Sequence, residues 1–392
     1  MKFATRLLTF DPAPGDRYTP ANTPIYQTAT FRQDDATAFG EYDYSRSGNP
    51  TRTVVEKQIA ALESGTRGFC FSTGLAAIAA VTRLLSPGEE IVACDDLYGG
   101  TYRLFSRILV KRGINVRYVD FTSLDAVAAA INRNTRLVYL ESPTNPLLQI
   151  IDIAAVSEIA HRSGALVCVD NSTMSPYLQR PLELGADIVL HSATKFLCGH
   201  SDVMAGAVVV ADEDLGQELY LIQNGEGAGL SPFDSYLLLR GTRTLSLRLD
   251  RQQTNARKIA ELLDAHPAVD HVYYPGLADQ RQLAIHRAQA SGDGAVLSFV
   301  TGDSEFSRTI VEATKLFAIT VSFGGVNSTI SLPNYMSHAS IPAHLRQQKS
   351  IPADLVRISV GAEDVDDLVD DLSQAFQIAA RQSAASPVLA AD

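Results

Sequence analysis

Residues 152–172 read DIAAVSEIAHRSGALVCVDNS, a helix pattern followed directly by a strand pattern, and this stretch decides the fold. Residues 152–164 place apolar side chains at helical spacing. Residues 165–172 form a continuous apolar run that ends in Asp170 and two further polar residues. A continuous apolar strand next to a helix is typical of a parallel sheet that helices cover on both faces.

The same alternation continues on both sides of this stretch. Strand patterns occur at residues 68–74, 90–96, 114–120, 135–146, 186–194 and 205–212. Helix patterns lie between the earlier ones, at residues 51–64, 75–85, 101–113 and 123–132. The fold class is therefore α/β, with a mostly parallel sheet flanked by helices. Ligands of such folds bind beyond the carboxyl ends of the strands, so the residues after each strand are the candidates for function.

The two ends of the chain have a different character. Residues 1–45 lack steady periodicity and are rich in Pro, Asp and Thr, which predicts an extended arm that packs on another domain or subunit. Residues 235–392 begin with one long helix or two helices and then show strand patterns of a smaller α+β domain, at residues 294–302, 318–325 and 355–361. We therefore predict an arm at residues 1–45, a main domain at 46–234 and a C-terminal domain at 235–392.

Composition narrows the class of protein. The chain has 392 residues, 46% of them hydrophobic, and a net charge of −11, which argues against nucleic acid and anionic membranes as partners. The N-terminus has no signal-peptide pattern and no stretch is long enough to span a membrane, so we expect a cytoplasmic protein. The cysteines, at positions 70, 94, 168 and 198, form no C-x-x-C pair, which predicts reduced thiols and no metal site.

One lysine stands in an apolar setting, in VLHSATKFLCG at residues 189–199. From this stretch alone, Lys195 either packs its stem while its ammonium reaches water, or is a buried amine with a shifted pKa that reacts. Other strand ends favour the second explanation. Thr73 and Gly74 precede a helix whose free N–H groups suit a phosphate, and Asp170 ends a neighbouring strand.

A phosphate cradle, an aspartate and a reactive lysine at one edge of a sheet are the parts that pyridoxal 5′-phosphate (PLP) requires. The lysine would form a Schiff base and the aspartate would keep the pyridine nitrogen protonated. Each residue also has an ordinary structural explanation: Thr73 as a helix cap, Asp170 as a turn residue and Tyr98 as a core tyrosine. Their combination at the strand ends indicates PLP.

Longer motifs point the same way. EYDYSRSGNPT (41–51), YGGTYR (98–103), ESPTNP (141–146), VRISVG (356–361) and the whole of residues 169–206 resemble one group of enzymes. This is the cystathionine γ-synthase-like group of fold-type I PLP enzymes, which includes cystathionine β- and γ-lyases, cystathionine γ-synthase and methionine γ-lyase. The resemblance implies a seven-stranded, mostly parallel sheet in the large domain.

The resemblance assigns roles around the cofactor. Lys195 would be the Schiff-base lysine and proton shuttle, and Asp170 would pair with the pyridine nitrogen. Tyr98 would stack on the ring and assist proton transfer, and Asn145 would lie near the ring hydroxyl. The phosphate would be held by residues of this chain and of a neighbouring subunit: Gly74, Leu75, Ser192 and Thr194 within the chain, and Tyr44 and Arg46 from the neighbour's arm.

The resemblance also assigns substrate contacts. Arg357, with Ser322, would grip the substrate carboxylate, a task that suits a guanidinium fork. Asp43 and Arg103 would contact the distal polar end of a long substrate, although a solvated loop acid explains Asp43 equally well. Sharing Tyr44 and Arg46 between subunits implies a homo-oligomer, at least a dimer, and the group implies a homotetramer.

Within the group, the sequence favours a carbon–sulfur lyase that acts on cystathionine in transsulfuration, by γ- or β-elimination. Gly100 stands where methionine γ-lyases typically have cysteine, which disfavours that activity, and Val321 replaces an acid of several γ-acting relatives. The alternatives are a cystathionine γ-synthase that joins cysteine to an O-acyl homoserine, a methionine γ-lyase, and a non-catalytic relative. Intact Lys195, Asp170 and Arg357 argue against the last.

Overall fold

The computed structural model describes residues 1–336 and 351–385. Its larger sheet has seven strands, the number that the resemblance implies, in the order β1-β7-β6-β5-β4-β2-β3. Their bounds are β1 Arg67–Phe71, β2 Glu90–Cys94, β3 Asn115–Val119, β4 Thr135–Glu141, β5 Leu166–Asp170, β6 Ile188–His191 and β7 Gly206–Val210. Strand β7 pairs antiparallel with both of its neighbours, and the other pairs in the sheet are parallel.

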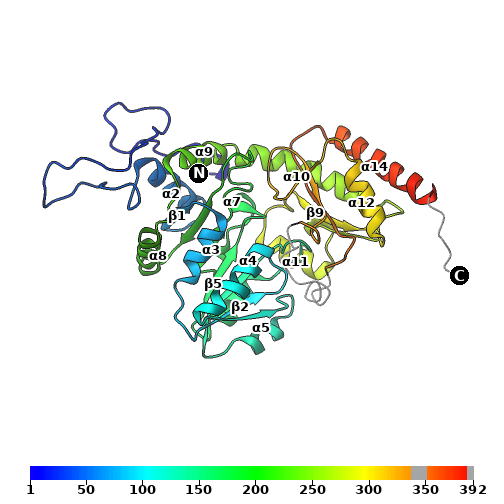
Figure 1. Ribbon diagram of the computed structural model, residues 1–392, viewed down its shortest axis with the longest axis horizontal. Coiled ribbons are helices and arrows are strands. Elements are labelled where there is room, and N and C mark those ends of the chain that lie inside the picture. Colours follow the sequence, from blue (N-terminus) through cyan, green and yellow to red (C-terminus); the bar gives the residue numbers. More distant parts are fainter. Residues whose placement is uncertain (337–350, 386–392) are drawn as a thin grey trace.

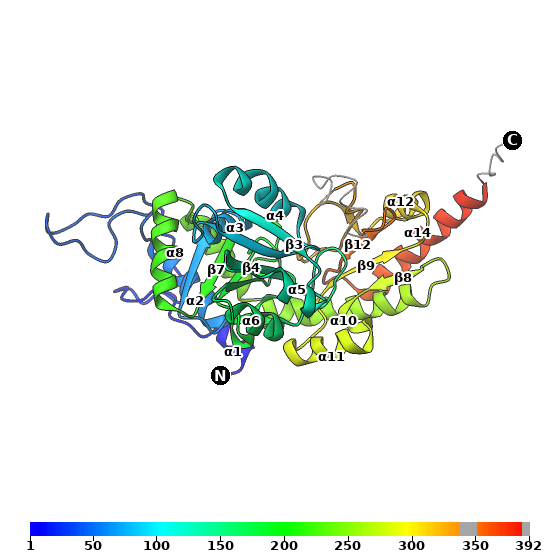
Figure 2. The same ribbon diagram turned by 90° about the horizontal axis from the view of Figure 1, so that it is seen from below.

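Helices cover both faces of this sheet. Figure 2 shows α3 and α4 on one side and α2, α5 and α6 on the other. The bounds of the helices in this part are α1 Phe3–Arg6, α2 Pro50–Leu62, α3 Gly74–Thr82, α4 Gly99–Leu104, α5 Leu124–Ala130, α6 Ile153–His161, α7 Ser175–Leu178 and α8 Glu213–Glu226. Strands β2, β6 and β7 are buried along their whole length, which explains their continuous apolar sequences.

The C-terminal part contains a second sheet of five strands, in the order β10-β11-β12-β9-β8. Its strands are β8 His271–Tyr273, β9 Val296–Val300, β10 Ala318–Ile319, β11 Thr329–Ser331 and β12 Val356–Ser359. Its helices, with the two that lead into it, are α9 Pro232–Thr242, α10 Leu245–Asp264, α11 Gln280–Gln289, α12 Ser304–Ala313 and α14 Val365–Ala385. In Figure 1 α10 runs from the large sheet toward this second unit.

Two predicted elements differ from the structure. The helix expected at 101–113 is divided into α4, a π-helical turn at Phe105–Leu109 and a 3₁₀ turn at Val110–Arg112. The apolar pattern at 318–325 forms only the two-residue strand β10. Short 3₁₀ turns also lie at Pro181–Leu184 and Pro275–Leu277.

Apart from the short helix α1 and an isolated bridge between Thr30 and Tyr44, the first 45 residues form turns and irregular segments. In Figure 1 the segment before α2 projects away from the body, on the side opposite to the second sheet. A buried arginine fixes the base of this arm, because Arg52 donates from Nη1 to the Ser45 carbonyl (2.8 Å) and from Nη2 to the Arg46 carbonyl (3.0 Å). The domain boundaries at residues 45/46 and 234/235 remain predictions.

Candidate active site

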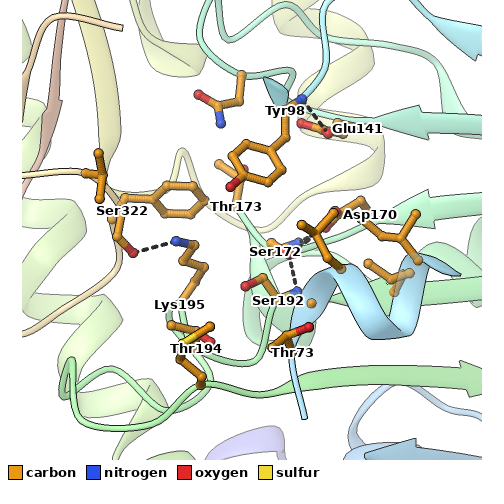
Figure 3. Close-up of a pocket in the computed structure, with 18 of the residues that line it drawn as sticks. Thr73, Tyr98, Glu141, Asp170, Ser172, Thr173, Ser192, Thr194, Lys195 and Ser322 are labelled. Carbon is orange, nitrogen blue, oxygen red and sulfur yellow. Dashed lines mark hydrogen bonds between the residues drawn. The ribbon is translucent and has the colours of Figure 1, made fainter. Parts of the chain in front are cut away.

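A cavity of about 390 Å³ lies at the carboxyl ends of the parallel strands, where it meets the C-terminal unit. Figure 3 shows its residues converging from different segments of the chain. Eleven predicted site residues line this cavity: Gly74, Leu75, Tyr98, Arg103, Asn145, Asp170, Ser192, Thr194, Lys195, Ser322 and Arg357. The sheet order explains this convergence, because β4, β5 and β6 are neighbours and end at the same edge.

The N-terminus of α3 forms one wall of the cavity. Thr73 caps the helix, with its hydroxyl accepting from the Ala76 N–H at 2.9 Å. Gly74 lies so close to the end of β6 that a Cβ there would stand 2.9 Å from Cβ of Ser192. The first turn of α3 therefore lies against Ser192, and Gly74, Leu75, Ser192 and Thr194 line the same cavity. Such an arrangement suits a phosphate group.

Asp170 lies at the end of β5 and is part of a short chain of hydrogen bonds. The Ser172 hydroxyl donates to Oδ1 of Asp170 (2.5 Å) and accepts from the N–H of Ser192 (2.6 Å). Burial raises the pKa of Asp170, while the bonds from Ser172, the charge of His191 and the bond from Tyr139 oppose that rise. A buried carboxylate held in this way is a suitable partner for a protonated ring nitrogen.

Lys195 enters the cavity from the segment after β6, and its Nζ donates to the hydroxyl of Ser322, as Figure 3 shows. Burial lowers the pKa of Lys195 to about 8; the nearby charge of Arg357 adds to this effect and Asp170 opposes it. Ser322 has a φ of +84°, in the left-handed region that few non-glycine residues adopt. Such strained residues cluster at functional sites. Lys195 is thus an amine that loses its proton at a much lower pH than an exposed lysine does.

Arg357, on β12, is 2% exposed and lies on the opposite wall. It donates to Oδ1 of Asn145 (3.0 Å) and to the carbonyl oxygen of Ser322 (2.9 Å). Within residues 1–336 and 351–385, no carboxylate forms an ion pair with it. Burial lowers its pKa to about 10, and Tyr98 opposes this. A buried guanidinium bonded to neutral oxygens is a receptor for an anionic group of a ligand.

Tyr98 precedes α4 and places its ring at the mouth of the cavity, where the residue is 39% exposed. Its backbone N–H donates to Oε1 of Glu141 at 2.9 Å. The ring packs over Gly100, because a Cβ there would stand 2.3 Å from Cε1 of Tyr98. A cysteine at position 100 would force the ring to move. Gly100 therefore sets the position of the ring.

The remaining predicted residues lie elsewhere. Asp43, Tyr44 and Arg46 belong to the arm and do not line the cavity of their own chain. Tyr44 is 43% exposed, and the Arg46 guanidinium lies 5.3 Å from the centre of its ring. Their proposed role in a neighbouring subunit's site therefore remains a prediction.

The sequence analysis missed several lining residues. Glu141, Ser172 and Thr173 each lie at or just after a strand end, so their positions were a usable signal. Phe323 lies beneath both cationic groups, with Nζ of Lys195 at 4.9 Å and the Arg357 guanidinium at 5.5 Å from its ring centre. Nothing in the local pattern of Phe323 distinguishes it from a core residue.

The donor set of the cavity fits PLP. Lys195 supplies a buried amine with a lowered pKa, Asp170 a buried carboxyl group, Tyr98 an aromatic ring, and the start of α3 a candidate phosphate cradle. No group of three or more potential metal ligands occurs within the described ranges, and no helix there is long and apolar enough to cross a membrane. The four cysteines are buried free thiols, and burial raises the pKa of each.

Comparison with known families agrees with this reading of the donor set. The family of Cys/Met metabolism PLP-dependent enzymes matches residues 4–377. The chain belongs to this family. It is therefore a PLP-dependent enzyme with the fold of that family.

Relatives in this family have different activities. The chain is 57% identical to the chloroplastic cystathionine β-lyase of Arabidopsis thaliana, covering 92% of this chain and 78% of that protein. It is 48% identical to the cystathionine γ-lyase of Bacillus subtilis, covering 93% and 96%. The crystal structure of cystathionine γ-synthase from Xanthomonas oryzae pv. oryzae in complex with cystathionine superimposes with a TM-score of 0.95, at 41% identity over 97% of this chain and 99% of that one.

Proposed function

We propose that the protein is a carbon–sulfur lyase that cleaves cystathionine into a thiol amino acid, a 2-keto acid and ammonia. The observation that carries this proposal is the pairing of two residues in one cavity. Lys195 is an amine with a pKa of about 8, and Arg357 is a buried guanidinium that has no carboxylate partner among the described residues. An amino acid substrate provides the missing carboxylate and a Cα proton within reach of a base. The lyase names of these two relatives support the choice of substrate.

Some residues of the chain bind and orient the substrate, and others transfer protons. PLP, when bound, accepts electron density from the substrate's Cα. Arg357 fixes the substrate carboxylate, and Asn145 fixes Arg357 in turn. Nζ of Lys195, neutral above its lowered pKa, removes the Cα proton, while the hydroxyl of Ser322 orients this amine. Tyr98, at the cavity mouth, is the second group that can move a proton, to the departing sulfur.

Cleavage on either side of the sulfur uses this same set of residues. β-Elimination releases homocysteine and pyruvate, whereas γ-elimination releases cysteine and 2-oxobutyrate. The position of the distal end of the substrate decides between them, and Arg103 at the cavity and Asp43 on a neighbour's arm are the proposed contacts. Val321 at the cavity adds no charge there.

We also infer that the protein works as a homo-oligomer in the cytoplasm. Tyr44 and Arg46 lie outside the cavity of their own chain and are exposed, so they are free to reach the phosphate site of a second copy. A dimer is the minimum, and a homotetramer follows from the resemblance. The buried reduced thiols suit a reducing compartment.

Product identification tests the proposed function. The PLP-loaded protein is incubated with cystathionine alone, and the keto acid and thiol are identified. Pyruvate with homocysteine, or 2-oxobutyrate with cysteine, supports the lyase and names the bond that breaks. Absence of both keto acids, together with formation of cystathionine from O-acyl homoserine and cysteine, contradicts the lyase and supports the synthase. The Lys195→Ala protein is the matched control and should form neither keto acid.

A further inference from the structure

A cluster of buried polar side chains lies next to the strand ends whose residues line the cavity. It consists of Glu63, Asn171, Gln179 and His191, and each of these residues is at most 2% exposed. Glu63 immediately follows helix α2, so a carboxylate from a distant part of the sequence reaches under the ends of β5 and β6. None of these side chains lines the cavity. The mechanism above therefore assigns them no role.

A single carboxylate oxygen joins the ends of the two strands. Oε1 of Glu63 accepts from Nε2 of His191 at 2.6 Å and from Nδ2 of Asn171 at 2.9 Å. Asn171 directly follows Asp170, and His191 directly precedes Ser192. Asp170 is the proposed partner of the pyridine nitrogen, and Ser192 is a proposed phosphate ligand. Each is thus adjacent in sequence to a residue that donates a hydrogen bond to Glu63.

Gln179 extends the same network to the third strand end. Its Nε2 donates to the carbonyl oxygen of Ser142 at 2.7 Å and to Oδ1 of Asn171 at 3.2 Å. Ser142 begins the loop that follows β4 and carries Asn145 into the cavity. On the cavity side, Ser172 bridges Asp170 and the Ser192 N–H. Hydrogen bonds therefore join the strand ends by two routes, one through Ser172 and the other through Asn171.

The free-energy cost of burying these polar groups indicates that the network does more than pack the core. Burying a carboxylate without an arginine or lysine partner costs several kcal/mol, and apolar side chains of similar volume would fill the same space. The Glu63 carboxylate is nevertheless buried, and it lies at the strand ends that carry the proposed cofactor ligands.

We propose that Glu63 is a positioning residue for PLP: through Asn171 and His191 it holds Asp170 and Ser192 at the separation that the cofactor needs. This inference rests on the proposed function, since it presupposes that PLP binds between those residues. It assigns Glu63 no contact with the cofactor or the substrate.

Cofactor affinity of the apoprotein provides the test. PLP dissociation constants are measured by absorbance titration for the wild type, Glu63→Ala, Glu63→Gln and His191→Leu, below the unfolding temperature of each. Glu63→Gln keeps an acceptor oxygen for both donors. His191→Leu removes the β6 contact alone and leaves Glu63 bonded to Asn171, so it serves if Glu63→Ala does not fold.

Asp371→Ala is the matched control for loss of a buried carboxylate. Asp371 is 6% exposed and accepts from the backbone N–H groups of Lys315 and Leu316, in the C-terminal unit and outside the cavity. Its removal should lower the urea midpoint of the apoprotein, as removal of Glu63 does, without changing the PLP site. The midpoints separate loss of stability from loss of cofactor affinity.

We expect Glu63→Ala and His191→Leu, where they fold, to bind PLP at least about tenfold more weakly than the wild type. Losses of this size are usual when a residue that orients a ligating side chain is removed. Glu63→Gln and Asp371→Ala should stay within about threefold. Binding by Glu63→Ala or His191→Leu within that range, or equal weakening by Asp371→Ala, would overturn the inference while leaving the proposed function intact. Failure of the wild type to bind PLP would overturn both.

Discussion

At the scale of single residues, the site combines two buried cations with one buried carboxylate. Lys195 and Arg357 both have lowered pKa values because burial disfavours their charged forms. Asp170 has a raised pKa for the same reason. Without its cofactor and substrate the cavity is therefore electrostatically unfavourable, and each ligand removes part of that cost. Function is obtained here at the expense of the stability of the apoprotein.

The loss of apoprotein stability that is caused by burying Lys195 can be measured. The pKa of Lys195 falls from 10.5 to about 8 on folding, so between those pH values the unfolded chain binds a proton that the folded chain does not. Stability of the apoprotein should therefore rise as pH increases from about 8 to about 10.5. At pH 7 the Lys195→Met apoprotein should be more stable than the wild type, by on the order of 2 kcal/mol.

Urea unfolding of both apoproteins at several pH values checks this expectation. The difference between their free energies of unfolding should shrink between pH 8 and 10.5, while pH effects from other groups cancel. A difference that does not change with pH would show that Lys195 is protonated in the folded apoprotein over that range.

Sequence reasoning reached most residues of the site because they stand at the ends of apolar strands. Asp170, Asn145 and Lys195 were visible in this way. Glu63 was not, because it lies inside a helix-to-strand connection, and only the three-dimensional contact with Asn171 and His191 gives it significance. Phe323 was missed for a similar reason: an aromatic residue near a strand pattern is usually part of the core.

At the scale of elements, the order of the strands creates the site. β4, β5 and β6 are adjacent and parallel, so the segments that follow them meet at one edge. Helix α3 packs against β6 and β7 and brings its N-terminus to the same edge. The alternating pattern predicted the parallel sheet, while the count of seven strands came from the resemblance. Local pattern failed at residues 101–113, where the single predicted helix has a π-helical turn and a 3₁₀ turn after α4.

The contact between α3 and β6 yields a prediction. A Cβ at Gly74 would meet Cα, Cβ and Oγ of Ser192 at 2.9–3.1 Å, so Gly74→Ala should push the start of α3 away from the end of β6. Since the start of α3 and Ser192 together form the proposed phosphate site, PLP affinity should fall by at least about tenfold. Equilibrium titration of the apoprotein with PLP measures this.

Gly225→Ala is the control for a glycine substitution in a helix. Gly225 lies in α8, and a Cβ there would meet nothing within 4 Å. Alanine should stabilise that helix by less than about 1 kcal/mol and leave PLP affinity unchanged. Equal PLP affinity of the Gly74→Ala protein and the wild type would contradict the assignment of the phosphate site to the start of α3.

At the scale of the whole molecule, the contacts within a single chain do not explain the function of the arm. It projects from the body in Figure 1, and the buried Arg52 fixes its base. Its exposed residues Tyr44 and Arg46 match the motif that resembles the phosphate-binding arm of neighbouring subunits. If these residues act in a second copy, each active site is composite.

Mixing inactive variants tests the composite site. Lys195→Ala and Arg46→Ala proteins should each be inactive or nearly so. In a mixed dimer, one site combines an intact Lys195 with an intact Arg46 from the partner's arm. Random re-association should then restore about a quarter of the wild-type turnover, since half of the dimers are mixed and each has one intact site. No recovery on mixing would place Arg46 in the site of its own chain.

The central claim is that Lys195, at the end of β6, holds the cofactor of a PLP-dependent lyase. Borohydride reduction of the PLP-loaded protein, followed by digestion and mass spectrometry, tests it most directly. The account predicts one pyridoxyl group per chain, on the peptide that contains Lys195, with reduction abolishing keto acid formation from cystathionine. A pyridoxyl group on a different lysine, or none in a protein that still cleaves cystathionine, would contradict it.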